Sequence, residues 1–168
     1  RYDPAEAKRL LKEAGYPDGF TIKLFAYPLA GSAYLPKLAE VIQGYWLKIG
    51  VKAEIINRGF ATIRPQIRGG PNKAPVDELV GQASVTTAGS NVSLPTVMAV
   101  YFGSNSSFAL SQGAPVQREL DSLLDASLIE VNEVKRGEAY AKILQLAMDT
   151  RVYDVIGTVP AVVGLGPR

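Results

Sequence analysis

The strongest constraint on the fold is a strand–helix–strand pattern within the first third of the chain. Residues 21–27 and 51–56 alternate between apolar and polar side chains, which predicts half-buried strands. Between them, apolar residues recur at helical spacing from Leu35 to Ile49, and Gly50 is placed to end that helix. Two strands joined through a helix form a parallel pair with a right-handed crossover. We therefore expect a βαβ unit here.

Helical and strand patterns alternate through the rest of the chain as well. Asp3 and Pro4 predict the cap and the first turn of a helix that ends at Gly15. A shorter helix is expected over 60–68, where Pro65 must lie in the first turn or bend the helix. Helices are further expected over 95–102, 116–128 and 134–149, a loop over 103–115, and strands over 78–85 and 152–163. This order predicts one α/β domain over residues 1–168.

The chain has 168 residues but no histidine and no cysteine. This composition excludes Ser-His-Asp and Cys-His catalysis, thiol redox chemistry and the usual zinc sites, so we expect no cofactor and no metal. Asp121 and Asp125 lie four residues apart on a predicted helix and could form an acid–base pair. A solvated helix face beside Arg118 is the favoured interpretation. Binding is therefore expected rather than catalysis.

The charges are nearly balanced, with 18 basic and 16 acidic residues and a net charge of +2. Arg58, Arg64 and Arg68 form the one basic stretch without acids, and we interpret them as an exposed helix face. A nucleic-acid surface needs a denser basic patch, so no nucleic-acid partner is expected. The chain shows no leader pattern and begins at Arg1 in a helix start, which suggests a piece of a longer protein.

Two segments are candidates for binding a small molecule. In parallel α/β sheets, ligands collect at the carboxyl ends of strands, where connecting loops point polar groups outward. One candidate segment follows the first strand and the other follows the third; a plain solvated loop remains the alternative for the second. The candidate residues are Tyr27, Ser32, Tyr34, Thr86, Thr87, Ala88, Gly89, Ser90 and Asn91. Trp46, in contrast, lies at core spacing on its helix.

Several motifs together resemble the peptide- and nickel-type solute-binding proteins of ABC importers. The most specific is the opening run, YDPAEAKRLL at 2–11 with EAGYPDGF at 13–20. The later motifs follow in the family's order: LKIGV at 47–51, IRGG at 67–70, ELDSLLDA at 119–126 and KRGEAY at 135–140. The resemblance covers essentially the whole chain.

This resemblance implies a periplasmic-binding-protein-like fold, a three-layer lobe with a mixed, mostly parallel sheet flanked by helices. It implies a periplasmic or extracellular, membrane-associated receptor that closes two lobes on a solute and delivers the solute to an ABC permease. The present chain would then be the second lobe, and the first lobe of the same protein would be missing. The expected partners are therefore a small-molecule or peptide ligand, that first lobe and the permease.

The loop after the third strand departs from the family's pattern. The family usually carries a tryptophan in this loop and an acidic residue before a proline, whereas Asn91 stands near that position and Pro95 follows. Because asparagine is neutral, a sugar, a capped peptide or another polar solute is as plausible a ligand as a free peptide. An effector-sensing or interaction module of a regulator, and a carboxylate-dependent enzyme, remain the alternative functions.

Overall fold

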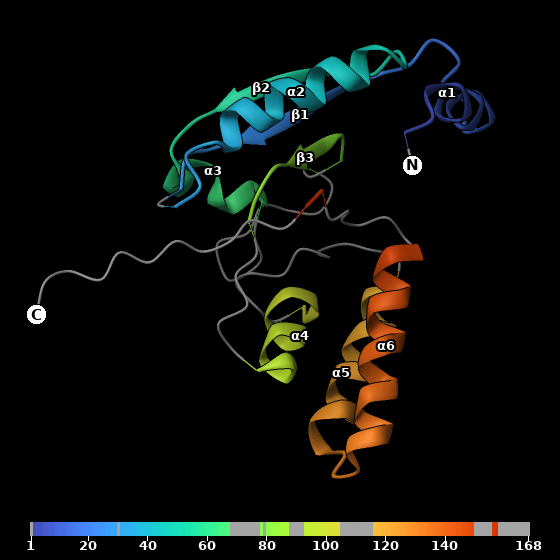
Figure 1. The fold of residues 1–168 in the computed structure, drawn as a ribbon, viewed down its shortest axis with the longest axis vertical. Helices are drawn as coiled ribbons and strands as arrows, with labels where there is room; N and C mark the ends of the chain where they lie inside the picture. The colour runs from blue at the N-terminus through green and yellow to red at the C-terminus, as the bar shows by residue number, and fades with distance from the viewer. Residues whose placement is uncertain are drawn as a thin grey trace, which may run out of the picture. The chain divides into compact units, whose positions relative to one another are not determined.

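β1 (Thr21–Ala26) is the central strand of a three-stranded sheet, with β2 (Lys52–Asn57) on one side and β3 (Gln82–Ser84) on the other (Figure 1). Both neighbours run parallel to β1. Because α2 (Leu35–Leu47) connects β1 to β2, the expected βαβ unit is confirmed. The computed structural model describes residues 2–29, 31–67, 78, 80–87, 93–104, 116–149 and 156–157.

The side chains of β1 alternate between two apolar layers, as the pleat of a strand requires. One layer lies between the sheet and α2, and the other lies between the sheet and α3 (Phe60–Ile67). The first layer consists of Leu24, Ala26, Leu35, Ala39, Ala53 and Val85, with Trp46 packed against it. The second layer consists of Phe25, Tyr27 and Ile63, with Phe60 and Ile56 packed against it. The sheet therefore has a helix on each face, which confirms the α/β prediction and the core position of Trp46.

β3 is shorter than the strand expected over 78–85. Glu78 lies outside the strand, and Gly81 makes a turn directly before it with a φ of +73°. The Gly81 carbonyl accepts a hydrogen bond from the amide of Lys23, and the Val85 amide donates to the carbonyl of Phe25, each at 3.0 Å. Pairing to β1 is therefore limited to a few residues between these two bonds.

Pro65 lies deeper in α3 than its ring would favour. It is the sixth residue of the helix rather than a residue of the first turn, so the first-turn alternative was wrong. Because proline has no backbone N–H, it makes no hydrogen bond to the carbonyl four residues earlier in the helix. The burial of Ile63 against the sheet, at 2% exposure, anchors α3 at this point.

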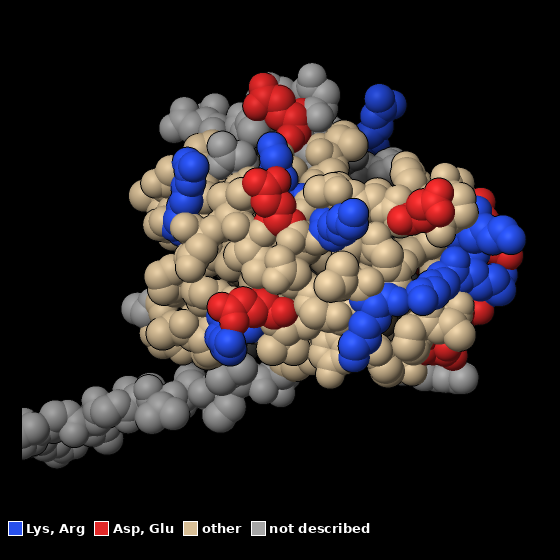
Figure 2. Space-filling view, turned by 90° about the horizontal axis from the view of Figure 1, so that it is seen from above, with Lys and Arg blue, Asp and Glu red and all other residues tan. Residues whose placement is uncertain are grey.

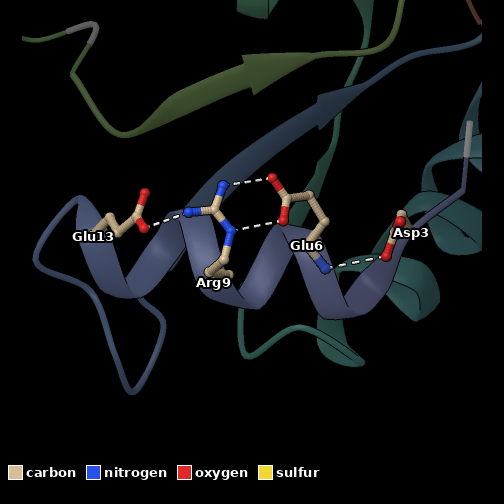
Figure 3. Close-up of polar contacts among 4 residues, drawn as sticks. All are labelled: Asp3, Glu6, Arg9 and Glu13. Atoms are coloured by element: carbon tan, nitrogen blue, oxygen red, sulfur yellow. Dashed lines mark hydrogen bonds and ion pairs between the residues drawn. The ribbon is translucent and has the colours of Figure 1, made fainter.

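α1 (Pro4–Glu13) begins where the sequence predicts and is held by local contacts (Figure 3). The Asp3 carboxylate accepts a hydrogen bond from the Glu6 amide at 3.1 Å, and Pro4 opens the helix. The Arg9 guanidinium donates to both Glu6 oxygens, at 2.6 and 2.7 Å, and also pairs with Glu13. No residue of α1 is buried, so its caps and its surface ion pairs define it more than core packing does.

Two glycines bring the turn after α1 against the end of α2. Gly19 and Gly50 both have positive φ angles, of 78° and 92°. A Cβ atom on Gly19 would lie 2.0 Å from the carbonyl oxygen of Gly50, well inside van der Waals contact. The amide of Lys52 donates to the carbonyl of Phe20 at 2.8 Å beside this contact. The close approach of two backbones thus fixes where β1 and β2 begin.

α4 (Leu94–Phe102), α5 (Gln117–Ile129) and α6 (Glu133–Asp149) belong to a second compact unit, distinct from the unit that contains the sheet. The three helices lie within one residue of the predicted boundaries. Their buried side chains form one apolar cluster: Met98, Phe102, Leu120, Leu124, Tyr140, Ile143 and Ala147. This cluster holds α4 and α6 against α5.

Some expectations fall largely outside the described residues. Of the strand expected over 152–163, only Ile156 and Gly157 are described, and these two belong to no strand. Of the loop expected over 103–115, only Gly103 and Ser104 are described, and neither belongs to a helix or strand. Within the described part of the chain, no helix is both long enough and apolar enough to cross a membrane.

The contact between Gly19 and Gly50 leads to a prediction about stability. Gly19→Ala should lower the free energy of unfolding by about 3 kcal/mol or more, because the new methyl group overlaps the Gly50 carbonyl at a positive φ. Gly44→Ala is the matched control, since a Cβ at this α2 position meets no described neighbour within 4 Å and should raise stability by about 1 kcal/mol. Urea unfolding measures both, and equal stabilities would contradict the predicted clash.

The ion pairs of α1 lead to a prediction about titration. The hydrogen bond from Arg9 holds the pKa of the Glu6 carboxyl below its ordinary value of 4.5. Because the folded-state pKa is depressed, this pair stabilises the helix above pH 4.5 and is lost as the pH falls through the folded-state value. NMR titration should show the Glu6 pKa rising towards 4.5 in Arg9→Gln and staying low in Lys12→Gln. A Glu6 pKa that is the same in Arg9→Gln as in the unaltered protein would contradict the pairing.

Candidate functional site

Both predicted ligand-binding segments leave the sheet at the same edge. Residues 27–34 follow β1, and residues from Thr86 onward follow β3, its parallel neighbour. From β1 the chain passes through α2 to β2, whereas β3 lies on the opposite side of β1. The connections therefore diverge between the carboxyl ends of β1 and β3, which is where open α/β sheets form a crevice for ligands.

Tyr27 connects the carboxyl ends of β1 and β3 directly. Its hydroxyl donates a hydrogen bond to Oγ1 of Thr86 at 2.6 Å, across 59 positions of sequence. Its ring lies 5.1 Å from the ring of Phe60, at an interplanar angle of 40°. The Tyr27 side chain is fully buried, with 0% exposure. The structure thus brings two predicted site residues together and gives Tyr27 an internal position.

The rest of the first segment is a tight turn that leads into α2. The Ser32 amide donates to the carbonyl of Leu29 at 2.8 Å, and Gly31 makes this turn with a φ of +75°. Ser32 is 9% exposed, and its carbonyl accepts from the amide of Leu35 at 3.2 Å. Tyr34, directly before α2, is 37% exposed. Tyr34 is therefore the aromatic side chain of this segment that a solute can reach.

The second segment is described only at its beginning. Thr86 and Thr87 are half-buried, and the Thr86 hydroxyl donates to the carbonyl of Thr87 at 3.4 Å. Ala88, Gly89, Ser90 and Asn91 lie outside the described residues. Ligand contact by the nine candidate residues stays a prediction. Phe60, at the first position of α3, packs against Tyr27 and Ile63, as its helical core spacing predicts.

Charged side chains are dispersed over one face of the molecule. On the face seen in Figure 2, Lys and Arg side chains lie among Asp and Glu side chains. Arg64 is exposed on α3, as expected. Arg58 is exposed too but precedes α3, so it is not part of the predicted helix face, and Arg68 lies outside the described residues. Among the residues that the structure describes, no cluster of three or more His, Cys, Asp or Glu could hold a metal ion. The described residues that directly follow β1 and β3 therefore offer hydroxyl, aromatic and backbone groups.

Asp121 has a structural partner in the second unit. Its Oδ1 accepts a hydrogen bond from the Ser104 amide at 2.9 Å and another from Nε2 of Gln117 at 3.2 Å. Gln117 also donates to the carbonyl of Phe102, at the end of α4, at 3.0 Å. Asp125, in contrast, is exposed on α5. The two carboxylates thus occupy different environments, and Asp121 ties the end of α4 to α5.

This arrangement predicts different consequences for the two aspartates. Asp121→Ala should lower the free energy of unfolding by about 1–2 kcal/mol, because the Ser104 amide and the Gln117 side chain lose an acceptor. Asp125→Ala on the same helix is the matched control and should change it by less than about 0.5 kcal/mol. Thermal or urea unfolding measures the difference, and equal effects would count against the role assigned to Asp121.

Comparison with known proteins identifies the protein family to which this chain belongs. Residues 1–107 match the middle region of the bacterial extracellular solute-binding proteins of family 5. The dipeptide-binding protein of Escherichia coli is 50% identical over 58 residues, which are 33% of this chain and 11% of that protein. Heme-binding protein A of Haemophilus influenzae is 28% identical over 141 residues, which are 83% of this chain and 24% of that protein.

A solved structure supports the same fold. The dipeptide-binding protein from Pseudoalteromonas sp., in complex with Met-Leu, superposes with a TM-score of 0.72 at 21% identity, over 90% of this chain and 29% of that chain. The chain thus spans less than a third of the length of these proteins. These relatives are binding proteins rather than enzymes, which argues against catalysis by Asp121 and Asp125. The chain belongs to the bacterial extracellular solute-binding proteins of family 5.

Proposed function

We propose that this chain is part of the substrate-binding component of an ABC-type importer, which captures a peptide-like or other polar solute and delivers it to a membrane permease. The family match over residues 1–107 is the observation that carries this function. Curated relatives named as dipeptide-binding and glutathione-binding proteins support a peptide-like solute. The protein would act outside the cytoplasm, in the periplasm or at the outer face of a membrane.

Capture would proceed by hinge closure of two lobes. Residues 1–168 would form one lobe, and the other lobe of the same protein would supply the facing half of the cleft. A solute that contacts both lobes binds the closed state more tightly than the open state and so shifts the equilibrium towards closure. The permease would then recognise the closed form. The hydroxyl and aromatic groups that follow the carboxyl ends of β1 and β3 suit a polar, uncharged portion of such a solute.

The chemistry of the second segment bears on the class of ligand. Asn91 offers a neutral amide at a position near which the family usually has an acid, so a free α-amino group would find no counter-charge from this residue. Tyr34 offers an exposed phenol on the other segment. Both groups can form hydrogen bonds with amides and hydroxyls. Capped peptides, peptides held through their backbone, and sugars therefore all remain in the proposed range of ligands.

Binding by the full-length protein tests this function. Calorimetric titrations with alanyl-alanine, N-acetyl-alanyl-alanine, reduced glutathione and maltose should show saturable binding of at least one solute. Tyr34→Ala should weaken that binding about tenfold, or about 1.4 kcal/mol, because it removes an exposed aromatic contact of the site. Tyr45→Ala is the matched control, since Tyr45 is similarly exposed but lies in the last turn of α2.

Closure can be followed on the same samples. Small-angle X-ray scattering should show a smaller radius of gyration when the bound solute is present, because the two lobes approach each other. Failure of all four solutes to bind would contradict the proposed ligand range. Binding without any change in the radius of gyration would contradict hinge closure while leaving the binding function intact.

A further inference from the structure

Tyr27 lies where the connections at the carboxyl edge of the sheet meet. It directly follows β1, its ring packs with Phe60 and Ile63 of α3, and its hydroxyl reaches Thr86 after β3. The Tyr27 side chain therefore links the carboxyl ends of β1 and β3 to α3, the helix that follows β2. This side chain is fully buried, so it touches protein atoms on all sides.

We propose that Tyr27 is a positioning residue of the ligand site, which holds Thr86, and through Thr86 the backbone at Thr87, in the orientation that meets the ligand. This inference rests on the proposed function. It assigns Tyr27 and Thr86 to the frame of the site and leaves ligand contact to Thr87 and to Tyr34.

The shortness of β3 makes this tie important. β3 pairs with β1 over only three residue pairs, from Lys23–Gln82 to Phe25–Ser84. The last backbone bond of this ladder runs from the Val85 amide to the Phe25 carbonyl. The bond from Tyr27 to Thr86 connects the two chains one residue further along. A side-chain hydrogen bond at this position restricts the conformations that the chain after Val85 samples before a solute binds.

The same bond orients the Thr86 hydroxyl. Because Oγ1 of Thr86 accepts a hydrogen bond from the Tyr27 hydroxyl, the hydroxyl hydrogen of Thr86 points elsewhere, and the Thr87 carbonyl lies 3.4 Å away as an acceptor. A short bond of 2.6 Å between a phenol and a hydroxyl, on a fully buried ring, restricts both side chains. Two consecutive hydrogen bonds thus connect the buried Tyr27 phenol, through the Thr86 hydroxyl, to the carbonyl of Thr87.

The test compares Tyr27→Phe, Thr86→Val, the double variant and Thr86→Ser in the full-length protein. Tyr140→Phe is the matched control: Tyr140 is also a buried tyrosine, but its hydroxyl has no hydrogen-bond partner among the described residues. The probes are alanyl-alanine and reduced glutathione, titrated well below the melting temperature of every variant. Hydrogen exchange at the amides of Thr86 and Thr87 is measured without ligand.

The positioning role predicts one set of results. Tyr27→Phe and Thr86→Val should each speed amide exchange at residues 86–87 and weaken binding about tenfold, and the double variant should be no weaker than either single one. Thr86→Ser keeps the acceptor oxygen and should bind like the unaltered protein. Tyr140→Phe should change neither exchange at 86–87 nor affinity. Rescue by serine separates a bond to the hydroxyl from a general loss of packing.

Two results would overturn the inference. Unchanged exchange at residues 86–87 in Tyr27→Phe would show that Tyr27 does not hold Thr86. Faster exchange with unchanged affinity would show that the bond serves stability alone. Failure of the unaltered protein to bind either peptide would instead contradict the peptide-like ligand of the proposed function, and the exchange data would still decide whether Tyr27 positions Thr86.

Discussion

The parallel pairing of β1 with both of its neighbours determines where the two candidate ligand-binding segments leave the sheet. Because β1 is central, its carboxyl end lies beside those of β2 and β3, and the chain leaves the sheet in different directions from there. Its alternating side chains bury Leu24 and Ala26 against α2, and Phe25 and Tyr27 against α3. The two apolar layers of the sheet and the placement of the candidate segments therefore both follow from the same strand.

Much of this arrangement follows from local sequence. Asp3 and Pro4 predict the start of α1, and the alternation in 21–27 predicts which side chains of β1 share a face. The order of helices and strands predicts the parallel pair and places both candidate segments at one edge of the sheet. These features depend on neighbours in the sequence, where helical and strand periodicity is informative.

The remaining features depend on residues that are far apart in the sequence. Alternation predicts the face of Tyr27 but not its bond to Thr86, which is 59 positions away. The length of β3 was overestimated, because the turn at Gly81 ends the pairing that an apolar run alone would extend. The role of Asp121 likewise depends on the Ser104 amide, which no spacing of carboxylates reveals. Long-range hydrogen bonds thus decide what local patterns leave open.

A crystal structure of the full-length protein with a bound solute tests the location of the site most directly. We predict that the solute lies at the carboxyl ends of β1 and β3, within hydrogen-bond distance of groups in residues 27–34 or 86–91, with Tyr27 buried and bonded to Thr86. A solute held only by α4, α5 and α6, or at the amino ends of the strands, would contradict this location.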